Sequence, residues 1–145
     1  MRTVSKKGDQ ISNDIGIATF PTPAGWTSNR SDRSTSVVFL RTGHGSKPKE
    51  MISIDVGTPA AAGGARGSAD ALAKKFGGSV SELEFTIDEE QAFKVSVPQN
   101  LKQLAPRECV VTERNGKVCM IIGASMSQNE VWPTVSEIAM ALRWN

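Results

Sequence analysis

Two apolar runs near the C-terminus of the chain, at residues 109–112 and 118–124, flank the polar residues 114–117, which read Arg-Asn-Gly-Lys. Asn-Gly is the preferred centre of a two-residue hairpin turn, because both central residues need positive φ, which Gly adopts freely and Asn tolerates. The pattern therefore predicts an antiparallel hairpin that reverses at residues 115 and 116.

This hairpin fixes the faces on which the two cysteines of the chain lie. Centring the turn there pairs Thr112 with Cys119 and Val110 with Ile121. Because side chains alternate between the two faces of a strand, Cys119 shares the face of Val110, whereas Cys109 lies on the other face. A disulfide needs Cβ atoms about 4 Å apart, so we predict two free thiols that pack as small hydrophobic residues.

Shorter stretches of apolar residues predict the remaining strands of a sheet. Residues 51–56 alternate apolar side chains with Ser and Asp, which is typical of a strand with one buried face. The polar stretch 28–36 indicates a loop. We expect the other strands at residues 15–20, 37–40, 83–87 and 93–97, with a tight turn at 88–91 between the last two.

Two segments show the apolar period of an amphipathic helix. The first covers residues 69–76, with Ser68 as its N-cap and Gly77 as the left-handed residue after its last turn. The second starts at Thr134, where residues 134–137 match a capping box. The predicted buried positions of this second helix are Val135, Ile138, Ala139 and Leu142.

About seven strands and two helices, with consecutive strands joined mostly by short turns, predict an α+β fold. We expect an antiparallel sheet of about six to seven strands flanked by helices, and not a doubly wound parallel sheet. Residues 14–145 form one domain in this interpretation, and the polar residues 1–13 form a flexible arm. No apolar run is long enough to cross a bilayer, so we predict no direct membrane span.

The order of these features resembles the PsbP-like superfamily over residues 15–144. The resemblance rests on a first strand that ends in Phe-Pro-Thr-Pro-Ala-Gly-Trp (20–26), the turn at 88–92, the Asn-Gly hairpin and a final helix that ends in Ala-Leu-Arg-Trp (141–144). The superfamily includes the extrinsic photosystem II protein, a Ran-binding nuclear-import factor, and bacterial envelope lipoproteins and secretion-associated chaperones. The resemblance implies an α/β/α sandwich that its members use chiefly to bind other proteins. No interface residue carries over, because the shared features are turns and not a functional motif.

The formal net charge of +2 is too small to indicate a nucleic-acid partner, but the charges are unevenly spread. Up to Glu50 the chain has eight Lys or Arg against four Asp or Glu, and beyond it nine against eleven. The basic front part is either a solvated surface or a face for an anionic partner. An aromatic side chain near a terminus can anchor a partner, since Trp is enriched at interaction hot spots. The candidate binding residues are therefore His44, Lys47, Lys49, Arg66 and Trp144.

The single histidine, His44, lies in a glycine-flanked loop at residues 42–48, close to Ser46. No G-x-S-x-G motif is present to hold a serine nucleophile, so we expect an exposed loop histidine and no assigned catalytic residue. A small hydrolase or transferase that uses His44 with a nucleophile such as Cys119 stays open as an alternative. One histidine and two cysteines on opposite faces cannot build a closed zinc site, and we expect no metal and no cofactor.

The glycine-rich residues 63–68 contain Arg66 and have the order of a phosphate-binding loop between a strand and a helix. Neither the P-loop pattern nor the dinucleotide-binding pattern is completed. Asp70, in the expected first helical turn, would also repel phosphate. We interpret these residues as a flexible connector.

The polar residues after Met1 lack the apolar core of an export signal. The sequence thus predicts a cytoplasmic protein, or a periplasmic or envelope protein if a signal has been removed. Together with the resemblance, it favours a non-enzymatic accessory module that binds another protein. A further alternative is a small-ligand carrier, which requires a closed apolar cavity between sheet and helices.

Overall fold

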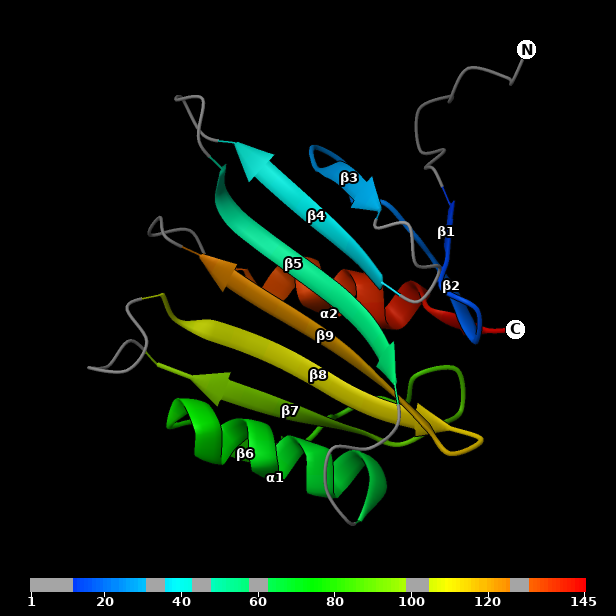
Figure 1. Cartoon of the computed structure of the whole chain (residues 1–145), viewed down its shortest axis with the longest axis vertical. Coiled ribbons are helices and arrows are strands. Elements are labelled where there is room, and N and C mark those ends of the chain that lie inside the picture. Colours follow the sequence, from blue (N-terminus) through cyan, green and yellow to red (C-terminus); the bar gives the residue numbers. More distant parts are fainter. Residues whose placement is uncertain (1–11, 31–35, 43–47, 58–62, 99–104, 126–130) are drawn as a thin grey trace.

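A computed structural model describes residues 12–30, 36–42, 48–57, 63–98, 105–125 and 131–145 of the chain. The strands of its main sheet are β3 (Thr27–Arg30), β4 (Ser36–Thr42), β5 (Pro48–Gly57), β6 (Ser79–Glu82), β7 (Ala92–Val97), β8 (Arg107–Arg114) and β9 (Lys117–Ser125). A smaller sheet contains β1 (Ser12–Asp14), β2 (Ala18–Pro21) and β10 (Arg143–Trp144). The spatial orders are β3-β4-β5-β9-β8-β7-β6 and β1-β2-β10, and every pair of neighbours is antiparallel (Figure 1).

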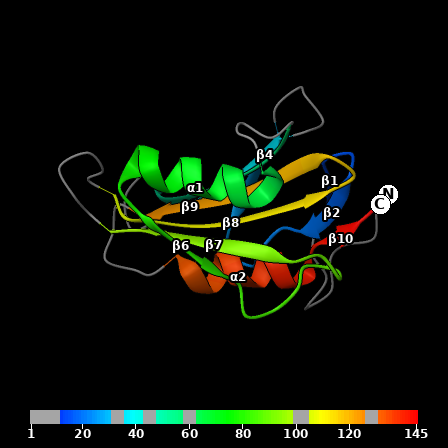
Figure 2. The same cartoon turned by 90° about the horizontal axis from the view of Figure 1, so that it is seen from below.

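Two helices cover opposite faces of the main sheet and make the domain a three-layered sandwich (Figure 2). Helix α1 (Gly64–Phe76) packs mainly on β6, β7 and β8. Helix α2 (Trp132–Ala141) packs on β8 and β9 from the other side and also touches β2. Each helix encloses its own hydrophobic core against the sheet. The α+β fold with an antiparallel sheet between helices, predicted from the sequence, is confirmed. Neither described helix is long and apolar enough to cross a membrane.

The hairpin of β8 and β9 has the predicted turn and register. Asn115 and Gly116 have φ angles of 53° and 76°, and Thr112 pairs with Cys119. Cys119 lies in the core under α2 and Cys109 in the core under α1, and both thiols are free and fully buried. The prediction of two unbridged cysteines on opposite faces is confirmed.

The N-terminal part of the chain differs from the prediction in two places. Of the strand expected at 15–20, only residues 18–20 are extended, in β2, because the chain reverses around Gly16, which has a φ of 96° and joins β1 to β2. β1 includes residues 12 and 13 of the expected arm, and residues 1–11 lie outside the described part. The polar stretch 28–36 was expected to be a loop, but residues up to Arg30 belong to β3. Among the described strands this one pairs with β4 alone in the main sheet, and its side chains at Thr27 and Asn29 are exposed.

Helix α1 begins at Gly64 and not at residue 69, so residues 64–67 are helical and the prediction of a flexible connector there is wrong. Ser68 lies inside the helix, and its predicted role as N-cap is also wrong. Gly77 follows the last turn with a φ of 80°, as predicted. Glycine is a poor helix former, which explains why the sequence pattern placed the start too late.

Helix α2 begins at Trp132, two residues before the predicted start, and has Pro133 in its first turn. No side chain caps its N-terminus, so the predicted capping box at Thr134 is wrong. The predicted core positions are all buried: Val135, Ile138, Ala139 and Leu142.

The strand predicted at residues 83–87 is wrong. The strand that pairs with β7 is β6, which ends at Glu82. Leu83 and Phe85 instead lie in an irregular segment after β6, and both pack against the core on the α2 side. The turn that follows is present, because Ile87 and Glu90 form an isolated antiparallel bridge. β6 is therefore the last strand of the main sheet at this edge.

Candidate functional site

The candidate binding residues from the sequence do not gather at one place. His44 and Lys47 lie outside the described residues, and Lys49 belongs to β5. Arg66 lies on α1 and Trp144 on β10. The polar and ring contacts of these last two side chains are with different neighbours, so the described candidates form no common site.

Arg66 lies on the surface of α1 beside two neighbours. Its Nε atom lies 3.3 Å from Oδ1 of Asp70, and its guanidinium carbon lies 5.5 Å from the centre of the Phe93 ring. Both charged side chains are more than half exposed, so the pair adds little to stability. Arg66 is thus an accessible cation on a helix surface and not part of a pocket for an anion.

The N-terminus of α1 is already occupied by a carboxylate from the chain. Ala65 donates its backbone N–H to Oε1 of Glu113 at 3.1 Å. A Cβ atom on Gly64 would lie within 3 Å of this carboxylate, and the φ of Gly64 is +61°, so glycine suits both the backbone conformation and the close approach of Glu113. Glu113 thereby complements the positive end of the helix dipole and stands where a phosphate would bind. The phosphate-loop interpretation fails for this reason and not because of Asp70, which lies beyond the first turn.

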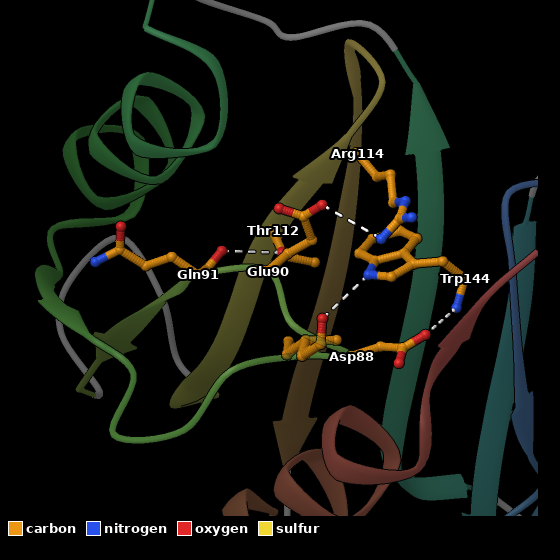
Figure 3. A network of polar contacts seen from close by, with 7 residues as sticks. Asp88, Glu90, Gln91, Thr112, Arg114 and Trp144 are labelled. Atoms are coloured by element: carbon orange, nitrogen blue, oxygen red, sulfur yellow. Dashed lines mark hydrogen bonds and ion pairs between the residues drawn. The ribbon is translucent and has the colours of Figure 1, made fainter.

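Trp144 joins the C-terminal strand to the turn that follows β6 (Figure 3). Its indole Nε1–H donates to the carbonyl of Ile87 at 3.0 Å, and its backbone N–H donates to Oδ2 of Asp88 at 2.8 Å. The Arg114 guanidinium lies 6.0 Å from the centre of the ring and 3.4 Å from Oε2 of Glu90. The half-buried ring also packs against the main core. Trp144 therefore has a structural role, because it connects β10 to the turn after β6. This role differs from the predicted binding role.

The turn held by Trp144 is conformationally strained. Asp88 and Glu89 have φ angles of 45° and 77°, a region that side chains other than Gly, Asn and Asp rarely adopt. For a residue such as Glu89 this conformation costs on the order of 1–3 kcal/mol and persists when its surroundings impose it. Thr112 adds a further contact, because its hydroxyl donates to the carbonyl of Gln91 at 3.1 Å. The contacts around Trp144 explain how the turn forms without a glycine.

The two thiols are poorly suited to nucleophilic catalysis. Burial raises the pKa of Cys109 and of Cys119 from 9.0 to about 12. The thiolate is the reactive form, so both side chains are nearly inert near neutral pH. Within the described residues, no three His, Cys, Asp or Glu side chains are grouped so that they could hold a metal ion.

A cleft of about 310 Å³ lies between α2 and the segment that follows β6. Trp132, Ser136 and Met140 line it from α2 at spacings of four residues, which place them along one side of the helix. Leu83 and Phe85 line the opposite wall. Met140 is 56% exposed, so the α2 side of the cleft presents apolar surface to solvent.

Lys94 on β7 also lines the cleft. Its Nζ atom lies 3.9 Å from the centre of the Trp132 ring and 3.9 Å from Oε2 of Glu108. The cation–π contact and the ion pair offset its charge and hold the indole ring at the cleft. Two exposed acidic residues, Glu82 and Glu84, lie at the β6 side.

The lining is mixed and several of its residues are exposed to solvent, which makes this an open cleft. It is not the closed apolar cavity that the small-ligand carrier hypothesis requires. This site was not predicted from the sequence, because the apolar period of α2 indicates only the buried side of the helix. The signal was present in the series Trp132, Ser136 and Met140, a second stripe of the helix beside its fully buried positions.

No family model and no curated protein matches this sequence. The fold is similar to that of a Bacteroides thetaiotaomicron VPI-5482 protein solved by crystallography, with a TM-score of 0.60 and 10% identity over 94% of this chain and 48% of the other. It is also similar to cyanobacterial PsbP (CyanoP) from Synechocystis sp. PCC 6803, with a TM-score of 0.55 and 14% identity over 98% and 91% of the two chains. The chain thus spans about half the length of the Bacteroides protein. At these identities the likeness establishes a PsbP-like fold and nothing about activity.

Proposed function

We propose that this chain is a non-enzymatic accessory module that binds another protein through the cleft beside α2. The observation that carries the proposal is the exposure of Met140, which lines this cleft together with the half-buried Trp132. Covering such apolar surface is favourable by about 25 cal/mol for each Å² removed from water. Aromatic residues and methionine are also enriched at protein interfaces.

Two further observations support a binding role over a catalytic one. The buried thiols have raised pKa values, so Cys119 is a poor nucleophile for the alternative that pairs it with His44. The fold shared with CyanoP also fits, since the resemblance to the PsbP-like superfamily implies protein binding. His44 itself lies outside the described residues and adds no support to either function.

The chain offers a matched pair of positions for a test. Met140 and Met51 are the two exposed large apolar residues of the described chain, with 56% and 44% of their surface exposed. Met51 lies on β5, on the opposite face of the sheet from the buried Ile52 and Ile54, where α1 does not cover the strand (Figure 1). The two methionines therefore sample two separate surfaces.

A photo-crosslinking amino acid placed at position 140 or at position 51 reports which surface contacts a partner in the cells that produce this protein. We expect a discrete adduct with one other protein from position 140 and none from position 51. Met140→Glu should weaken the captured complex by about tenfold, which corresponds to about 1.4 kcal/mol, whereas Met51→Glu should leave it unchanged. Adducts from position 51 alone, or equal adducts from both positions, would refute the cleft as the binding site.

A further inference from the structure

β6 presents a backbone edge directly beside the cleft. It is the terminal strand of the main sheet, and among the described residues its one strand partner is β7. The N–H of Leu83 donates to the carbonyl of Ala92 at 2.9 Å, and Ser81 pairs with Lys94 two residues before it. Hydrogen-bonded and non-hydrogen-bonded pairs alternate along antiparallel strands, so the N–H and C=O groups of Val80 and Glu82 face away from β7.

The edge of β6 has no lysine, proline or bulge, three features that commonly block strand addition, and it pairs with β7 in unbroken register. It is a short edge of four residues, Ser-Val-Ser-Glu, and its length and the charge of Glu82 limit how long an added strand can be. Gly78 allows the close approach, because a Cβ atom there would lie 2.5 Å from the carbonyl oxygen of Ser96. The edge is therefore regular from its first residue and able to accept hydrogen bonds from another strand.

The cleft lies where side chains of an added strand would point. Successive side chains of a strand alternate between the two faces of the sheet, and Ser81 and Lys94 face α2 at the floor of the cleft. Every second side chain of a strand added beside β6 would thus enter the space next to Trp132 and Met140. Backbone pairing would supply affinity, and the cleft would select apolar side chains.

The charges at this edge indicate which polar side chains an added strand would carry. Glu82 and Glu84 are exposed, and neither forms an ion pair with another residue of the described chain. Lys94, the one cation among the described residues that line the cleft, already has Glu108 and the Trp132 ring as partners. A segment with Lys or Arg between its apolar residues complements this edge, and an acidic segment is repelled.

We infer that β6 accepts an extended segment of a partner protein as an eighth strand of the main sheet. Apolar side chains of that segment occupy the cleft beside α2, and its basic side chains lie near Glu82 and Glu84. This inference rests on the proposed protein-binding function and specifies how the partner is held and which chemistry is recognised.

The test uses three synthetic peptides of the same length with blocked ends. The first alternates lysine with valine or leucine, the second has the same side chains but N-methyl groups on alternate backbone amides, and the third has glutamate in place of lysine. Each peptide is titrated into the ¹⁵N-labelled protein, and amide and indole resonances are followed by NMR. We expect saturable shifts at Val80, Glu82 and the Trp132 indole with the first peptide only.

Two variants at position 82 distinguish the contribution of the backbone hydrogen bond from that of the side-chain charge. Glu82→Pro removes an outward N–H, which an edge strand tolerates, and should reduce affinity for the basic peptide by about tenfold or more. Glu82→Gln keeps the N–H and removes the charge, so it should reduce affinity by only a few-fold, with a weaker dependence on salt.

Equal binding of the N-methylated or the acidic peptide would overturn strand addition, as would peptide-induced shifts around Met51. A concentration-dependent dimer joined through Val80 and Glu82 would also overturn it, because a second copy would then occupy the edge. If crosslinking at position 140 succeeds while all peptides fail, the binding function stands and this mode of binding is refuted. If position 140 gives no adduct in cells but the basic peptide binds at β6, the mode of strand addition and its chemistry stand, and the proposed role of binding a partner protein in cells falls.

Discussion

Ser68 is buried in α1 with 3% of its surface exposed, and its hydroxyl has no hydrogen-bond partner among the described residues. An unsatisfied buried hydroxyl costs about 1–3 kcal/mol, and serine is a weaker helix former than alanine. Ser68→Ala should therefore raise the free energy of unfolding by about 1 kcal/mol, measured by urea denaturation. Ser79→Ala, at an exposed position of β6, is the control and should change it little. A loss of stability in Ser68→Ala would mean that the hydroxyl has a partner after all.

The two buried cysteines should make the free energy of unfolding fall at alkaline pH. The pKa of each thiol is 9.0 when unfolded and about 12 when folded, because burial disfavours the thiolate. A raised folded pKa stabilises the native state fully below the unfolded value, and this contribution is lost as pH rises from 9.0 towards 12. We expect the urea midpoint to fall across this range, and the fall should be smaller in a Cys109→Ala, Cys119→Ala double variant. The native thiols should also react with a disulfide reagent only when urea unfolds the protein.

Gly123 is a contact point between elements, where α2 packs onto β9. A Cβ atom at this position would lie 2.6 Å from Cγ2 of Val135 and 3.0 Å from Cγ2 of Val131. Gly123→Ala should therefore force α2 away from the sheet and lower the free energy of unfolding by about 1–3 kcal/mol. The control is Gly57→Ala on β5, where an added Cβ atom meets nothing within 4 Å. Thermal and urea denaturation of both variants measure the difference, and equal stabilities would show that α2 can shift without cost.

Elements whose formation depends on nearby residues were predictable from the sequence. The β8–β9 hairpin follows from the Asn-Gly turn, and the buried face of α2 follows from its apolar period. The start of α1 was not predictable, because its N-terminus is completed by Glu113, 48 residues further along the chain from Ala65. β3 was missed because a polar edge strand has no apolar alternation. Leu83 and Phe85 suggested a strand, but their apolar side chains belong to the packing and the cleft beside β6.

The candidate site was hidden from the sequence for a related reason. The cleft is formed by α2, β7 and the segment after β6, and their relative positions depend on the order of strands in the sheet. Sequence patterns indicate which face of an element is buried, but not which exposed side chains of distant elements become neighbours. Trp132 and Lys94 illustrate this, because their contact joins residues of α2 and β7.

At the scale of the whole molecule, helix coverage of the main sheet is uneven. α1 lies over β6, β7 and β8 and leaves the corresponding face of β4 and β5 without a helix (Figure 1). The C-terminal strand β10 pairs with β2 and also reaches the turn at residues 88–89 through Trp144. The smaller sheet, the end of the chain and the segment beside the cleft are thereby connected. Replacing Trp144 should consequently change the conformation of the turn at residues 88–89, which follows the proposed binding edge.

A double-mutant cycle between Glu89 and Trp144 tests this connection. Glu89 is exposed with a φ of 77°, so Glu89→Gly should relieve backbone strain and raise the free energy of unfolding by about 1 kcal/mol. Trp144→Ala should lower it by about 2 kcal/mol or more, because it removes a half-buried ring and the bond to Ile87. If Trp144 imposes the strain, the turn relaxes in Trp144→Ala, and Glu89→Gly then gains less in that background, with a coupling of about 0.5 kcal/mol or more. Additive effects in urea denaturation would show instead that the turn keeps its conformation without the tryptophan.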